Sequence, residues 1–131
     1  MTNPDPTRKI RIALGTAFTG AGIAHIVKHE WFENLVPESV AQFRKPISAV
    51  TAALQLVGGI AMFIPQARAL ARWVNLTMLV PTLPAAIAQR NTPDVLRRAG
   101  VPPALAPVRA VVQAFVAALT WWATRPPADQ P

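Results

Sequence analysis

Polar side chains of a few types interrupt the long apolar stretches of this 131-residue chain. Within those stretches stand His25, Gln55, Asn75, Arg109 and Gln113. In apolar surroundings an unpartnered polar group is costly, so such side chains turn toward one another or toward a polar ligand. We predict a cluster of His25, Gln55, Arg109 and Gln113. It would be either a structural hydrogen-bond network or a pocket for a quinone headgroup or another small polar molecule.

A metal site is the second chemistry that the spacing suggests. His25, His29 and Glu33 are spaced at i, i+4 and i+8, which places them on one face only if a helix continues through all three. Lys28 adds an unfavourable positive charge, and the chain has only 2 histidines. The sequence therefore favours no metal site, and His29 and Glu33 are the residues to check.

Nucleophilic and redox chemistry find little support. Ser39 and Ser48 are the serines of the chain, and no catalytic motif surrounds either of them. The chain has 0 cysteines and 0 tyrosines, which excludes thiolate metal sites, disulfides and thiol redox chemistry carried by this chain. We expect no independent catalytic activity, no catalytic residue and no cofactor other than a bound quinone.

Four blocks without formal charge must hold the candidate cluster in place: 12–27, 46–67, 73–89 and 110–124. About 20 apolar residues at 1.5 Å per residue match a hydrocarbon core of roughly 30 Å. A soluble bundle would need a polar stripe on each helix, and the run 47–65 offers only three polar side chains. The net charge of +7 suits anionic lipid better than nucleic acid, because the basic residues flank the blocks.

The pattern predicts an all-α fold, an integral membrane four-helix bundle formed as a single transmembrane domain over residues 1–131. Its helices are expected at about 10–28, 47–65, 69–89 and 107–125. Short interfacial helices should lie in the two loops on the side opposite the N-terminus. One follows the first helix, and the other begins with Thr92 as its N-cap and covers about 93–99. Counted by helical turns, the four cluster residues converge near these loops.

The charge distribution bears on the orientation. We expect a retained first helix, because residues 1–10 do not resemble a cleavable signal peptide. An even number of spans puts both termini on one side. Arg8, Lys9 and Arg11 precede the first helix, which usually dominates, so we expect a multi-pass protein of the inner (plasma) membrane with both termini cytoplasmic. The heavy use of Ala, Arg and Pro is typical of a GC-rich, actinobacterial genome.

Four segments together resemble the DoxX-like family of small four-helix membrane proteins, which is related to the DoxD/DoxX subunits of thiosulfate:quinone oxidoreductase. They are FTGAGIAHIVKHEWFENLVPE, LQLVGGIAMFIPQAR, LVPTLPAAIA and VRAVVQAFVAALTWWA, and their order covers nearly the whole chain. The resemblance implies His25, Arg109 and Gln113 as matching polar positions. Many family members have Glu where this chain has Gln55 and Asn where it has Ala86, which puts proton transfer by a carboxylate in doubt.

Three functions remain as hypotheses. The first is an accessory or scaffold subunit of a larger membrane assembly, which fits the small size and the apolar surface. The second is a quinone-linked redox component, which the resemblance implies. The third is a small-solute transporter, for which 131 residues would have to form an oligomer. The expected partners are the lipid bilayer, other membrane subunits or further copies of this chain, and no nucleic acid.

Overall fold

The computed structural model describes residues 5–36, 38–91 and 93–126, and every regular element within them is helical. In chain order the elements are α1 (Arg8–Val27), α2 (His29–Glu33), η1 (Glu38–Phe43), α3 (Arg44–Met62), η2 (Pro65–Ala67), α4 (Arg68–Ala88), η3 (Gln89–Asn91), α5 (Pro93–Arg98), η4 (Pro103–Leu105) and α6 (Ala106–Ala123). The elements labelled η are 3₁₀-helices.

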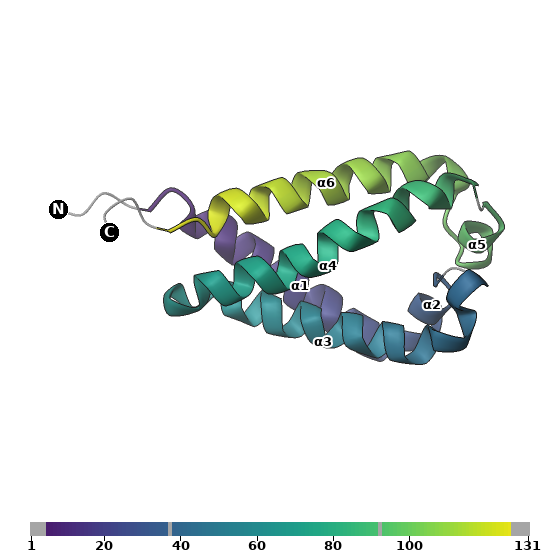
Figure 1. The fold of residues 1–131 in the computed structure, drawn as a ribbon, viewed down its shortest axis with the longest axis horizontal. Coiled ribbons are helices and arrows are strands. Elements are labelled where there is room, and N and C mark those ends of the chain that lie inside the picture. Colours follow the sequence, from purple (N-terminus) through teal and green to yellow (C-terminus); the bar gives the residue numbers. More distant parts are fainter. Residues whose placement is uncertain (1–4, 37, 92, 127–131) are drawn as a thin grey trace.

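Four long helices make up the body of the molecule (Figure 1). α1 packs along α3, and α4 packs along α6, while the α3–α4 hairpin joins the two pairs. α1 begins and α6 ends at the end that holds η2, which we call the near end. The pairs diverge toward the opposite, far end, where α2 and α5 lie.

The long helices match the predicted ranges to within three residues, and the largest differences are in α3. It begins at Arg44 rather than at 47, because Pro46 sits in the first turn, where its missing N–H costs no helical hydrogen bond. It ends at Met62 rather than at 65. Pro65 disfavours helical backbone at the preceding residue, and Ile64 is extended with φ −105° and ψ 110°.

Short helices occupy both far-end connections. α2 and η1 follow α1, and α5 runs from Pro93 to Arg98. Thr92, the expected N-cap of α5, lies outside the described residues. Gly100 follows α5 with a positive φ of 74°, which is the left-handed conformation that glycine commonly supplies after a helix.

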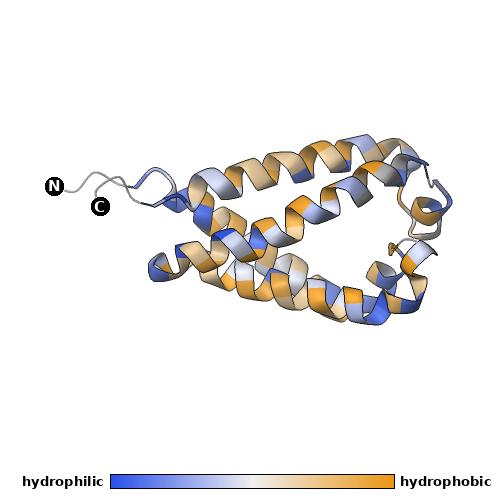
Figure 2. Cartoon of the chain, in the orientation of Figure 1, coloured by the Kyte–Doolittle hydropathy of each residue, from blue (hydrophilic) through white to orange (hydrophobic). Residues whose placement is uncertain are grey.

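Three segments are long and apolar enough to cross a membrane: Arg8–Val27, Glu38–Met62 and Pro103–Ala123. α4 is long enough with 21 residues, but Arg72, Asn75 and its two prolines lower its hydropathy. Hydrophobic residues predominate along α1, α3, α4 and α6 (Figure 2). In the apolar window of the segment Pro103–Ala123 only 11% of the residues are buried within the protein. Most of the apolar surface of α6 is therefore not covered by the rest of the chain.

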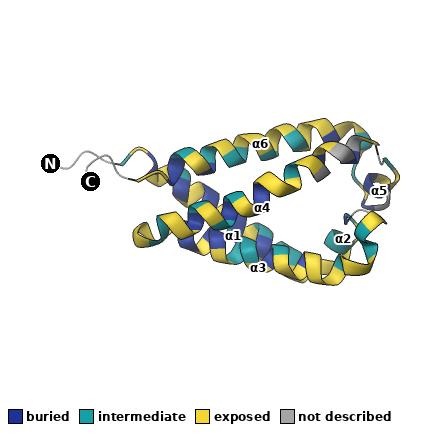
Figure 3. Cartoon of the chain, viewed as in Figure 1, coloured by how far each residue is buried: buried dark blue, intermediate teal, exposed yellow. Residues whose placement is uncertain are grey.

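Buried residues lie along the near-end half of the long helices and on α5 (Figure 3). The core consists of Leu14, Phe18, Ala61, Met62, Ala71, Met78, Leu79 and Ala123. Glycines permit the close crossing of α1 and α3. A Cβ at Gly59 would come within 2.6 Å of the backbone nitrogen of Thr19, and one at Gly15 within 2.9 Å of the Gly59 carbonyl. A Cβ at Gly20 would meet nothing within 4 Å. Close packing therefore explains Gly15 and Gly59 but not Gly20.

Candidate functional site

A cavity of about 370 Å³ lies between the two helix pairs at the far end. His25, Gln55, Arg109 and Gln113 all line it, so the structure brings the four predicted residues to one place. Further polar lining comes from Ser48, Thr51, Thr82 and Gln89. Asn75 is not part of it: this side chain is fully buried and donates to the Gly58 carbonyl at 3.2 Å, so it joins α4 to α3.

Two of the four residues are held by side chains of α4 and η3. Gln113 Nε2 donates to the Thr82 hydroxyl at 2.8 Å and to the Leu79 carbonyl at 2.9 Å. Arg109 donates to Gln89 Oε1. Both pairs bridge α6 to the end of α4, the stretch that contains Pro81 and Pro84. These bridges fix the polar wall on one side of the cavity.

His25 is held separately, on the opposite wall. Its Nδ1 lies 3.2 Å from the Ala21 carbonyl, and its ring stacks on Phe32 at 3.6 Å between centroids. A hydrogen bond to a carbonyl oxygen requires Nδ1 to carry the proton, so in the neutral ring Nε2 is an acceptor. His25 therefore offers an acceptor, whereas Arg109 can only donate.

Two polar oxygens in the wall have no hydrogen-bond partner within the described residues. They are Gln55 Oε1 and Ser48 Oγ, which belong to α3 and lie inside the protein surface. A buried polar atom without a partner costs about 1–3 kcal/mol. Native proteins rarely retain such atoms without a reason, and ligand contact is one such reason.

A second, apolar cavity of about 470 Å³ adjoins the first. The two share Arg109 and Gln113, together with Leu79, Leu96 and Val101. Its remaining wall is formed by apolar side chains of η4 and α6, of which Val108 and Val112 are exposed. A polar chamber and an apolar one thus meet at two polar side chains, and the apolar chamber lies on the outer side of the bundle.

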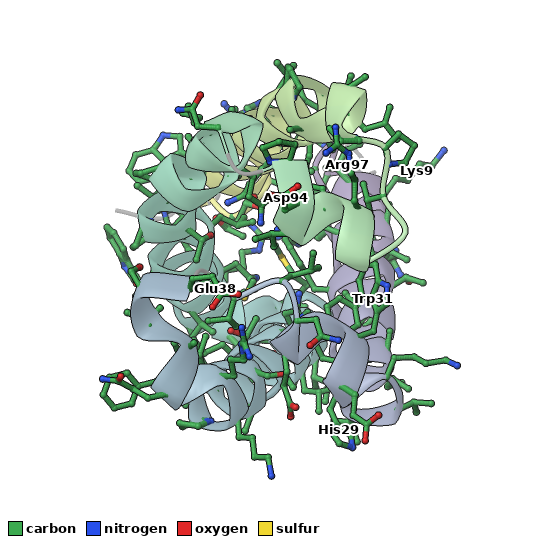
Figure 4. The ribbon with its side chains drawn as sticks, turned by 90° about the vertical axis from the view of Figure 1, so that its right-hand side faces the viewer. Lys9, His29, Trp31, Glu38, Asp94 and Arg97 are labelled. Carbon is green, nitrogen blue, oxygen red and sulfur yellow. The ribbon has the colours of Figure 1, made fainter. Side chains whose placement is uncertain are left out.

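The far end of the cavity is covered by the short helices (Figure 4). Trp31 on α2 donates its indole N–H to the Ala99 carbonyl, beyond α5, at 2.7 Å. Its ring meets the edge of Phe32 at 4.7 Å, and Phe32 in turn stacks on His25. Asp94 and Arg97 of α5 form an exposed ion pair of 3.3 Å at this surface. One hydrogen bond from Trp31 therefore joins the two loops above the cavity.

The metal spacing is not realised as one helical face. α1 ends at Val27, and Lys28 has the non-helical angles φ −111° and ψ 38° before α2 begins at His29. His29 pairs with Glu33 at 3.2 Å on the exposed side of α2. Across the described residues no group of three or more His, Asp and Glu side chains could hold a metal ion.

A buried charge network at the near end escaped the sequence analysis. Arg11, expected at the surface, is only 5% exposed and donates to Asp5 at 3.0 Å, to Thr7 and to the Ala123 carbonyl at 3.2 Å. Arg68 pairs with the same Asp5 oxygen at 2.6 Å. Hydrogen bonds from Thr7 and then the Arg11 guanidinium hold the pKa of the Asp5 carboxyl far below its usual range. This network fastens α1, α4 and α6 together.

Sequence reasoning also did not place four further polar lining residues of the cavity in the cluster: Ser48, Thr51, Thr82 and Gln89. Ser48 lies two turns before Gln55 in α3, and this spacing could have placed both on one face. Thr82 stands between two prolines and Gln89 just beyond α4, so only the fold brings them to Gln113 and Arg109.

No curated protein and no solved structure matches the chain. A family model matches residues 14–124, from the first turns of α1 to the end of α6. That span includes the complete far-end cavity and part of the near-end network. The chain belongs to the family described as Domain of unknown function (DUF8561).

Proposed function

We propose that this protein is a ligand-binding accessory subunit of the inner membrane, whose far-end cavity holds the polar head of a small membrane-soluble molecule. The observation that carries this proposal is the junction of the two far-end cavities. The polar chamber has unpartnered oxygens on Gln55 and Ser48, and the apolar chamber adjoins it at Arg109 and Gln113. An amphiphilic ligand would place its head in the first chamber and its chain in the second.

A quinone fits this arrangement chemically. Its carbonyl oxygens can accept hydrogen bonds from Arg109, and a quinol hydroxyl can donate to Gln55 Oε1 or His25 Nε2. The DoxX-like resemblance favours the same ligand. Because this chain has Gln55 where many such proteins have Glu, we propose that it binds the ligand and leaves any proton-coupled electron transfer to partner subunits.

The membrane placement is part of the proposal. All four long helices, α4 included, would cross the bilayer. Arg72 would lie at one end of α4, and the polar side chains in the interior of α4 would face other helices. Both termini would lie in the cytoplasm, at the near end. The exposed apolar side chains of α6, such as Val111 and Phe115, would contact lipid or another subunit.

The ligand is tested on protein purified in mild detergent. Solvent extraction and mass spectrometry should recover a quinone or another amphiphile in near-stoichiometric amount. Loss of the Gln55 hydrogen bond in Gln55→Leu should weaken rebinding about tenfold. Gln66→Leu is the matched control, since Gln66 is the same residue type but lies at the near end. Equal retention in both variants would refute the site.

Placement and assembly are tested in cells. The protein should stay in the membrane fraction through carbonate extraction, and a reporter at the C-terminus should report a cytoplasmic location. Cross-linking followed by mild solubilisation should recover a defined complex. Release by carbonate would end the membrane proposal, and an external reporter would reverse the orientation.

A further inference from the structure

A separate cavity of about 600 Å³ opens at the near end, remote from the proposed ligand chamber. Arg68 and Arg72 of α4 line it, together with Gln66, Trp73 and Thr124. The structure places both arginines on one cavity wall, one helical turn apart.

Arg72 is held by aromatic rings and by no acidic group within the described residues. Its guanidinium carbon lies 3.3 Å from the centre of the Trp121 ring and 5.8 Å from that of Trp73. Stacking uses the flat face of a guanidinium group, and the N–H donors at the edge of the group stay available for other acceptors. Arg72 Nε is buried, yet no acceptor within the described residues reaches it.

The charge of this end is not balanced by its own carboxylate. Arg11 and Arg68 share Asp5, so two positive charges face one negative charge before Arg72 is counted. Arg68 and Arg72 are related by i and i+4, a spacing at which like charges repel. Arg68 Nε, like that of Arg72, is buried with no acceptor within the described residues. An anion between the two guanidinium groups would remove the repulsion.

We propose that this cavity binds the phosphate of an anionic phospholipid, with Arg72 and Arg68 as its ligands. Arginine is suited to phosphate because its planar donors match the oxygens in pairs. Trp73 is 59% exposed and Trp121 52% exposed beside the site, as expected for side chains at a membrane interface. The proposal requires membrane placement but is independent of what the far-end cavity binds.

The test uses the purified full chain in a neutral detergent. Thermal unfolding is followed while dioctanoyl-phosphatidylglycerol, dioctanoyl-phosphatidylcholine or inorganic phosphate is titrated. The anionic lipid should raise the midpoint saturably, and phosphatidylcholine should not. Arg72→Gln should weaken the apparent affinity for phosphatidylglycerol about tenfold, the loss expected for a charge-assisted hydrogen bond. Arg125→Gln is the matched control, because Arg125 lies over Trp122 at the same end, outside this cavity.

The outcomes separate the sources of the anion. Saturable stabilisation by the lipid that only Arg72→Gln weakens supports a headgroup site. If inorganic phosphate at equal concentration stabilises as well as the lipid, the site takes free phosphate and the lipid proposal is wrong. Equal losses in both variants would mean unspecific charge attraction and would also overturn it. Should Arg72→Gln not fold, Arg72→Lys keeps the charge without the paired donors, and an unchanged lipid affinity there would contradict the site.

Discussion

The near and far ends of this molecule differ in how their polar side chains are paired, although the same four long helices form both. At the near end Arg11, Asp5 and Arg68 form a network of short hydrogen bonds, and buried apolar side chains fill the crossing beside it. At the far end the helix pairs diverge, and Gln55 Oε1 and Ser48 Oγ have no hydrogen-bond partner within the described residues. The ion pairs that fasten α1 to α4 through Asp5 therefore lie at the near end, whereas the two unpartnered oxygens of α3 lie in the wall of the far-end cavity.

The difference shows that a polar side chain within apolar surroundings does not have a single meaning. Arg11 has three acceptors and ties three helices together, so removing it would loosen the fold. Gln55 Oε1 accepts no hydrogen bond within the described residues, so the free-energy cost of burying this oxygen is not offset by a contact between helices. Their hydrogen-bond partners therefore distinguish Arg11, a structural residue, from Gln55, a candidate functional one.

The largest effect is expected where α1 and α3 touch. Gly59→Ala should lower the free energy of unfolding by about 3 kcal/mol, because its Cβ would collide with the Thr19 backbone and force the helices apart. Gly20→Ala, whose Cβ meets nothing, should be neutral or stabilise by up to about 1 kcal/mol through helix propensity. Denaturation in detergent micelles measures both. Equal effects would show that this crossing is not tightly packed.

A smaller loss is expected from the near-end network. Asp5→Asn should destabilise by about 2 kcal/mol at neutral pH, since Arg11 and Arg68 lose their shared carboxylate. Because the folded pKa of Asp5 is depressed, its stabilisation is full above the usual carboxyl range and is lost as the pH falls below it. The difference between the wild type and the variant should therefore begin to shrink as the pH falls below about 4, and it should vanish only below the depressed pKa of folded Asp5. A pH-independent difference would contradict this role.

The lengths of the uncharged blocks and their flanking charges were enough to predict the long helices, because both depend only on neighbours in the chain. The position of Arg11 was not predictable in that way. Three basic residues precede the first predicted span, and only the fold decides that Arg11 turns inward to Asp5 and Ala123 while Arg8 stays exposed. Long-range partners of this kind leave no local signal.

The residues of the candidate site were also predictable from the sequence, but their hydrogen-bond partners were not. Depth counted along the helices brought His25, Gln55, Arg109 and Gln113 to one level, and all four line the cavity. Their hydrogen-bond partners were not foreseen. Arg109 bonds Gln89 and not Gln113, since the pairing depends on how α6 rotates against the end of α4.

The cover of the far-end cavity should contribute less than the near-end network. Trp31→Phe keeps the ring and removes the hydrogen bond to Ala99, so we expect a loss of about 1 kcal/mol. The same change should speed hydrogen exchange in α2 and α5 while leaving the near end of α1 unaffected. Trp73→Phe is the control, an exposed tryptophan at the other end. Uniform exchange changes would mean that the two ends are not separable.

The smallest effects concern coupling within the cavity wall. Gln113 donates to Thr82 at 2.8 Å, so Gln113→Leu and Thr82→Val should be non-additive by about 0.6 kcal/mol, the average for hydrogen bonds between membrane helices. His25 and Gln55 each have contacts, but no bond joins them in the structure, so His25→Leu and Gln55→Leu should add within about 0.3 kcal/mol in ligand-free protein. Both double-mutant cycles are measured by unfolding in micelles, first without and then with the extracted ligand. Coupling of His25 to Gln55 that emerges only with ligand would indicate that one molecule spans the cavity. Strong coupling without ligand would instead show that the four residues form one structural network, and the contrast between the ion pairs of Asp5 at the near end and the unpartnered oxygens of the far-end cavity would no longer hold.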